Sequence, residues 1–251
     1  MSFAEVVCIA LAGLAAGTIN TVVGSGTLIT FPVLLAFGYA PVTANVSNTI
    51  GLVPGSVSGA IGYRAELAGQ RDRALRLGTM SVLGGITGAA LLLVLPSSAF
   101  KEIVPVFIAL ALVLTLLQPR LQAALAHREM RRHHAHRVLT AAAVYLTGVY
   151  GGYFGAAQGI MLLAILGVAL DQSLQRTNAL KNVLAGLVNG VAGVYFIFAA
   201  PHVAWGPAAV IAVAAILGAQ LGARYGRRLS PDALRALIVV VGISAILQLV
   251  L

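Results

Sequence analysis

Long runs of apolar residues with very little charge are the feature that most restricts the fold of this chain. Of its 251 residues, 59% are hydrophobic and only 9% are charged, whereas about a quarter of the residues of a soluble globular protein are charged. Many of the runs have the length that a helix needs to cross a hydrocarbon core of roughly 30 Å. The sequence therefore predicts an all-α polytopic membrane protein.

The apolar segments fall into two groups of five, separated by one long polar stretch. They are 3–22, 26–39, 41–63, 77–95 and 103–118, and then 138–154, 159–170, 174–199, 207–225 and 236–251. We predict a first membrane repeat at 1–118, a basic linker at 119–137 and a second membrane repeat at 138–251. In each repeat the second segment is too short to cross a bilayer alone at about 1.5 Å per residue. We therefore expect a short, broken helix at this place in each half.

The two groups are related in sequence. A shift of 133 residues places Gly26 on Gly159, Asn45 on Asn178, Asn48 on Lys181, Thr49 on Asn182 and Ser56 on Asn189. Polar residues that match inside apolar helices are rarely accidental, so we predict a duplicated fold. Because each repeat has an odd number of segments, the repeats should be inverted relative to each other, as in many secondary transporters.

The basic residues between segments indicate how the chain crosses the membrane. If the short segments cross, all of the 16 Lys and Arg residues except Lys101 lie on one side. If the short segments are re-entrant instead, the basic residues divide almost evenly. The positive-inside rule favours the first arrangement, which puts the 119–137 linker in the cytoplasm and both termini outside. The N-terminal stretch has no basic region and contains Glu5, so no cleaved signal peptide is expected.

Segment 174–199 carries a polar face that is unusual for a membrane helix. Asn178, Lys181, Asn182 and Asn189 share one side of a helix. Lys181 lies about 12 Å beyond a helix start at Ser173. It could bind substrate, snorkel to the inner interface or pair within the core, and we favour the first because intramembrane charge is usually functional. Arg176 is expected to be an interface anchor.

Several stretches of the chain resemble the sulfite exporter TauE/SafE family. They are GSGTLITFPVLLAFG and PVTANVSNTIGLVPGSVSGAIGYRAEL in the first repeat, and YGGYFGAAQGIMLLAILGV and LQRTNALKNVLAGLVNGVAG in the second. The resemblance spans nearly the whole chain. It implies a permease for small sulfur-containing anions such as sulfite, sulfoacetate or related sulfonates.

The residues themselves also favour an anion site. The start of a helix attracts anions through its unpaired N–H groups and its dipole, and glycine there lets backbone approach a ligand. Two short helices that begin at Gly26 and Gly159 should direct these ends toward the middle of the membrane. Side-chain donors could come from Ser25, Thr27 and Gln158, from Asn45, Asn48 and Thr49, and from Asn178, Lys181 and Asn182. These residues form the predicted substrate site.

Other classes of function are less well supported. The carboxylates are Glu5, Glu66, Asp72, Glu102, Glu129, Asp171 and Asp232, all at segment ends or in loops. No paired-acid or HExxH motif is present, so a membrane enzyme is disfavoured. An uptake permease or a channel-like anion pathway of the same fold is the main alternative to an exporter.

The expected partners follow from charge and small residues. The net charge of +9 belongs to loops beside apolar segments, which indicates membrane lipids and not nucleic acid. The linker residues His127, His133, His134 and His136 are expected to face solvent or lipid headgroups. We predict no metal and no cofactor. Abundant small residues on several segments favour close helix packing and a homodimer.

Overall fold

A computed structural model describes residues 1–126, 135–226 and 231–250. The described chain consists of ten helices and contains no strand, which confirms the all-α fold. They are α1 (Phe3–Val22), α2 (Thr27–Ala36), α3 (Pro41–Gly62), α4 (Arg71–Val94), α5 (Ser97–Ala126), α6 (Ala135–Tyr153), α7 (Gln158–Ala169), α8 (Leu174–Ala199), α9 (Trp205–Tyr225) and α10 (Pro231–Val250).

Helix length separates two kinds of segment. In the part of the chain that the structure describes, five helices are long and apolar enough to cross a membrane: α1, α4, α5 as far as Arg120, α8 and α9. The apolar helices α2 and α7 contain only 10 and 12 residues, which corresponds to about 15 and 18 Å. They match the two segments that the sequence predicts to be short.

Several helices extend beyond the predicted apolar segments at their polar ends. α4 begins at Arg71 and not at 77, α5 runs from Ser97 to Ala126 and not from 103 to 118, and α10 begins at Pro231 and not at 236. Hydropathy marks where a helix leaves the hydrocarbon, whereas backbone hydrogen bonding continues into polar surroundings. α5 also contains Pro105 and Pro119, which membrane helices tolerate when neighbouring groups satisfy the freed backbone.

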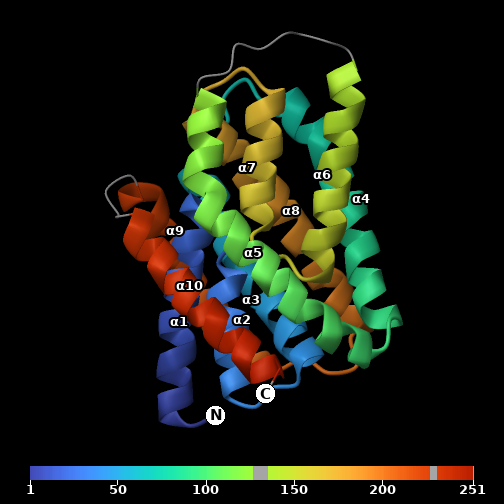
Figure 1. Ribbon diagram of the computed structural model, residues 1–251, viewed down its shortest axis with the longest axis vertical. Coiled ribbons are helices and arrows are strands. Elements are labelled where there is room, and N and C mark those ends of the chain that lie inside the picture. Colours follow the sequence, from blue (N-terminus) through green and yellow to red (C-terminus); the bar gives the residue numbers. More distant parts are fainter. Residues whose placement is uncertain (127–134, 227–230, 251) are drawn as a thin grey trace.

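Two helical hairpins form the centre of the molecule. α1 and α2 make the first hairpin, and α2 returns to the end at which α1 starts, since the Tyr39 hydroxyl donates to Glu5 at 2.6 Å. α6 and α7 make the second, and Figure 1 shows α1 starting at the lower end and α6 at the upper end. Ser25, at the tip of the first hairpin, is fully buried. The short helices therefore turn back inside the molecule. Each hairpin begins and ends at the same end of the molecule, which is also where two complete crossings would bring the chain.

The described arginines gather at one end. Arg176, at the start of α8, donates to the Ala68 carbonyl at 2.8 Å, and the Gln70 amide donates to the Arg176 carbonyl at 3.1 Å. Arg73 donates to Gln172 at 3.0 Å. The turn between α3 and α4 and the start of α8 thus form one basic surface, and the termini lie at the other end in Figure 1.

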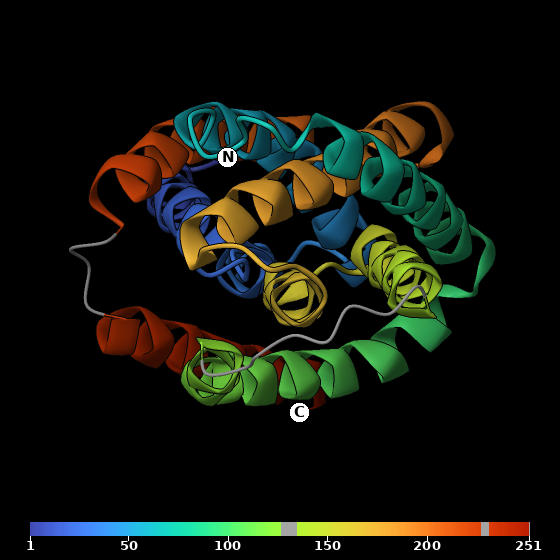
Figure 2. The ribbon, with the colours of Figure 1, turned by 90° about the horizontal axis from the view of Figure 1, so that it is seen from above.

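Corresponding helices of the two halves pack in corresponding ways. α1 packs on α9 and α6 packs on α4, while α3 contacts α9 and α8 contacts α4. Glycine brings these backbones together: a Cβ on Gly218 would lie 2.0 Å from the Leu14 carbonyl oxygen, and one on Gly84 would lie 2.3 Å from that of Tyr145. Viewed from above, α5 and α10 form one layer and α3, α4 and α9 form another, with the hairpins between them (Figure 2). α8 runs obliquely from the middle of the molecule to the layer of α3 and α4.

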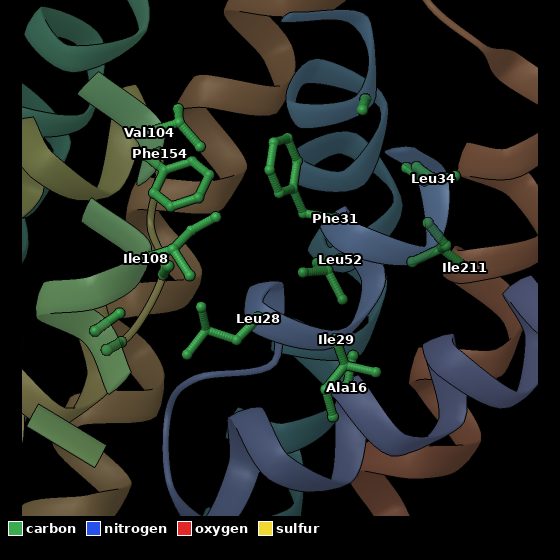
Figure 3. Close-up of a cluster of buried hydrophobic side chains, with 14 of the residues drawn as sticks. Ala16, Leu28, Ile29, Phe31, Leu34, Leu52, Val104, Ile108, Phe154 and Ile211 are labelled. Atoms are coloured by element: carbon green, nitrogen blue, oxygen red, sulfur yellow. The ribbon is translucent and has the colours of Figure 1, made fainter. Parts of the chain in front are cut away.

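An apolar cluster packs α2 against α5 and the end of α6. The Phe31 ring of α2 meets Phe154 edge-on, with centroids 5.2 Å apart, and Phe100 of α5 lies 6.4 Å from Phe31. Figure 3 shows Val104 and Ile108 of α5 on the same side of this contact. The cluster joins α2, α5 and the end of α6, which are far apart in sequence.

Candidate functional site

The two hairpin tips touch at the centre of the molecule. The Gly159 amide donates to the Gly24 carbonyl at 3.0 Å. A Cβ on Gly24 would lie 2.4 Å from the Gly159 Cα, and Gly24 has a φ of +93°, a region that favours glycine. The approach of the two backbones therefore requires glycine on both tips.

Side chains within each hairpin stabilise its tip. In the first, the Gly26 amide donates to the Asn20 side-chain oxygen at 2.8 Å. In the second, the Tyr150 hydroxyl donates to the Ala156 carbonyl. The Gly26 amide, which the sequence suggested as an anion donor, is thus already bonded within its own hairpin.

Lys181 is bonded to the end of helix α1. Its side chain is fully buried, and Nζ donates to the carbonyls of Asn20 at 2.8 Å and Thr21 at 3.4 Å. The last turn of a helix has unpaired carbonyls and the negative end of the dipole, so a cation there is favourable. The lysine does not reach the surface, which rules out the snorkelling interpretation.

The asparagines beside Lys181 approach the same helix end. Asn178 and Asn182 both donate to the Thr21 carbonyl, at 3.1 and 3.3 Å. In the other half, Asn45 of α3 donates to the carbonyl of Tyr153, the last residue of α6, at 2.9 Å. Each third helix therefore caps the hairpin of the opposite repeat.

A small polar cavity lies next to these contacts. Its volume is about 30 Å³, enough for about two waters. Its walls are Asn20, Thr21, Gly24, Thr27, Ser56, Gly59, Gly155, Gln158, Gly159, Lys181, Asn182, Ala185 and Asn189. Both hairpin tips, α3 and α8 thus contribute to it. None of these residues is acidic.

Gln158 and Lys181 each have a hydrogen-bond donor at the cavity that no described residue accepts. The Gln158 Nε2 atom is buried and has no partner among the described residues. An ammonium has three N–H donors, and Lys181 uses two of them on α1. A positive charge, a free amide donor and no carboxylate together favour a small anion.

The structure brings together only part of the site that the sequence predicts. Thr27, Gln158, Gly159, Lys181 and Asn182 line the cavity, and Asn178 caps α1 beside it. Ser25, Gly26, Asn45, Asn48 and Thr49 are not among the lining residues. Asn45 caps α6, and Asn48 accepts a hydrogen bond from Thr30 of α2.

Asn20 lines the cavity but is not part of the site predicted from the sequence. Asn20 contributes its carbonyl to Lys181 and its side chain to Gly26, and its position just before a glycine break was the available signal. Ser56 and Asn189, which the alignment of the two halves pairs and which belong to the predicted polar faces of the third segments, also line the cavity. The Asn189 amide donates to the Ser56 hydroxyl at 3.2 Å.

Two further expectations from the sequence concern Arg176 and the linker histidines. Arg176 donates to the Ala68 carbonyl in the turn between α3 and α4 at the basic end, and its role as an interface anchor stays a prediction. Of the predicted linker, residues 127–134 lie outside the described residues, and with them His127, His133 and His134.

Comparisons with known proteins give a consistent result. The profile of the family described as "Sulfite exporter TauE/SafE" matches residues 9–249. A probable membrane transporter protein, ORF9, of a Sinorhizobium species is 29% identical over 95% of this chain and 90% of its own length. The probable membrane transporter protein YfcA of Escherichia coli K12 is 27% identical over 90% of this chain and 82% of its own. No solved structure matches the chain significantly.

Proposed function

Because the chain belongs to the sulfite exporter TauE/SafE family of membrane transporters, we propose that it exports small sulfur-containing anions across the cytoplasmic membrane. The substrates are sulfite or organosulfonates of the sulfoacetate type. The observation that carries the proposal is the central cavity, where the buried Lys181 ammonium and the unpaired Gln158 amide meet no carboxylate.

The cavity suits a small oxyanion for physical reasons. Thr27 and Gln158 are the first residues of α2 and α7, so the positive ends of two helix dipoles lie at its wall. Lys181 adds an ammonium group, whose partners are the neutral carbonyls of Asn20 and Thr21. Sulfite or a sulfonate group offers several oxygens to these donors. A single cation holds the anion without preventing its release.

The two repeats are inverted and operate by alternating access around this cavity. Support comes from the opposite starting ends of α1 and α6 (Figure 1) and from the corresponding helix pairs of the two halves. An anion that attracts the Lys181 ammonium competes with the Asn20 and Thr21 carbonyls. Binding therefore weakens one connection between α8 and the first hairpin, which provides a coupling between the ligand and hairpin movement.

The orientation is that of the positive-inside rule. The basic surface formed by Arg73 and Arg176 faces the cytoplasm, together with the 119–137 linker, and both termini lie outside. Membrane lipids surround the apolar helices, and the protein assembles as a homodimer. An uptake permease or a channel-like pathway with the same site is the second candidate. The relatives are named as transporters, which agrees with a protein that is not an enzyme.

Transport by purified protein in liposomes tests the proposal. Sulfite, sulfoacetate, taurine and sulfate are loaded on one side at a time, so that substrate and direction are measured together. Lys181→Ala should strongly reduce transport of the preferred anion, and Lys101→Ala, which removes an exposed lysine at the start of α5, should not. Wild-type protein that moves none of the sulfur anions would refute the proposal.

A further inference from the structure

A large apolar groove runs along the contact between α3 and α8. These helices lie on the side of the molecule away from α5 and α10 (Figure 2). The groove has a volume of about 1020 Å³, comparable to the largest pockets for small organic ligands. Val57 and Ile61 of α3 and Val194 and Phe198 of α8 line it and are each more than half exposed. No described side chain covers this groove.

The groove adjoins the polar cavity. Ser56 and Asn182 line both spaces. The hydrogen bond from Asn189 to Ser56 connects α8 to α3 at this boundary. The groove and the cavity therefore share part of their walls, at Ser56 of α3 and Asn182 of α8.

The charged residues that line the cavity and the groove are all basic. Lys181 is the charged residue of the cavity wall and Arg64 that of the groove wall, and no acidic residue lines either space. Most of the groove surface is aliphatic or aromatic. The two adjoining spaces together are complementary to an amphiphile with an anionic head and an apolar body.

The floor of the groove is open because of glycine. A Cβ on Gly190 would meet no atom within 4 Å, and one on Gly186 would lie 3.5 Å from the Ser56 Cβ. A Cβ at Gly190 therefore finds open space, at a residue that lines the groove. The position therefore offers a way to fill the groove and leave the cavity intact.

We propose, on the basis of the proposed function, that this groove is a subsite for the apolar part of organic anions such as alkanesulfonates, whose sulfonate binds beside Lys181. Substrates then reach beyond the 30 Å³ of the polar cavity, with the head in the cavity and the tail between α3 and α8. The Ser56–Asn189 pair must separate for the tail to pass.

The test measures how tail length changes affinity. Methane-, ethane-, propane- and butanesulfonate compete with sulfite for uptake by wild-type protein in liposomes. Each methylene that enters the groove should lower the half-inhibitory concentration about fourfold. In Gly190→Leu this dependence should flatten, while sulfite and methanesulfonate behave as in wild type. Ala142→Leu, at an exposed position of α6 outside the groove, should keep the wild-type dependence.

Other outcomes would overturn the inference. Equal dependence on tail length in wild type and Gly190→Leu, or none in wild type, would remove the subsite. An equal loss for every anion, sulfite included, would identify the groove as a lipid-binding or mechanical element. Val57→Phe narrows the groove from the side of α3 and must give the same flattened dependence on tail length as Gly190→Leu. The test therefore remains valid if one of the two variants fails to fold. Failure of wild type to recognise sulfite and methanesulfonate would refute the proposed function itself and the inference with it.

Discussion

Replacing Lys181 with methionine removes the buried charge and keeps a side chain of similar length. The Asn20 carbonyl then loses the lysine as its donor, while the Thr21 carbonyl keeps Asn178 and Asn182. An unsatisfied buried carbonyl costs about 1–3 kcal/mol. Removal of an ammonium that has no acidic partner in the cavity relieves an opposing desolvation cost. We therefore expect the free energy of unfolding to change by less than about 3 kcal/mol, so that the variant still folds.

The effect on the anion should be larger than the effect on the fold. A hydrogen bond to a charged partner contributes about 1.5–3 kcal/mol, and each 1.4 kcal/mol is about a tenfold change in affinity. Lys181→Met should thus weaken sulfite binding about 10- to 140-fold. Lys181→Arg should restore only part of this, because its planar fork needs a different space in a cavity of about 30 Å³.

The assay compares the sulfite dependence of thermal stability in detergent with uptake of sulfite into liposomes. Lys101→Met makes the same chemical change at an exposed lysine and serves as the matched control. If Lys181→Met bound and transported sulfite like Lys101→Met, the lysine would only cap α1. The anion site would then have to lie elsewhere.

Three further predictions follow from the packing and the charge distribution. Gly159→Ala should destabilise the protein by about 1–3 kcal/mol, measured by thermal unfolding, because its Cβ would lie 2.4 Å from the Gly24 backbone. The control Gly190→Ala should be neutral or stabilising, because its Cβ would have no atom within 4 Å. In a Cys8→Ser background, single cysteines at Ser97 and Arg71 should react with impermeant reagents from opposite sides, and labelling from the same side would contradict the predicted orientation. Native mass spectrometry from mild detergent should show a homodimer, and a monomer at every protein and lipid concentration would count against it.

Local sequence properties were sufficient for the class of protein and for much of its layout. Hydropathy and segment length predicted a polytopic helical membrane protein with two short helices, which became α2 and α7. The helical period placed Asn178, Lys181 and Asn182 on one face, and all three approach the end of α1. Such features depend on residues within a few turns of each other, so they can be read without the fold. Helix ends were less accurate, as for α4, because hydropathy reports the surroundings of a helix and not its hydrogen bonds.

The tertiary structure decided which of the polar residues meet. The shift of 133 residues aligns Asn48 with Lys181 in sequence, yet Lys181 borders the cavity and Asn48 bonds to Thr30. The bond between Lys181 and the Asn20 carbonyl joins residues 161 positions apart, and the Gly24–Gly159 contact joins two separate hairpins. Such contacts depend on where helices cross and how closely glycine lets their backbones approach. No local pattern contains that information, so the cavity and the groove between α3 and α8 emerge only when the helices are packed together.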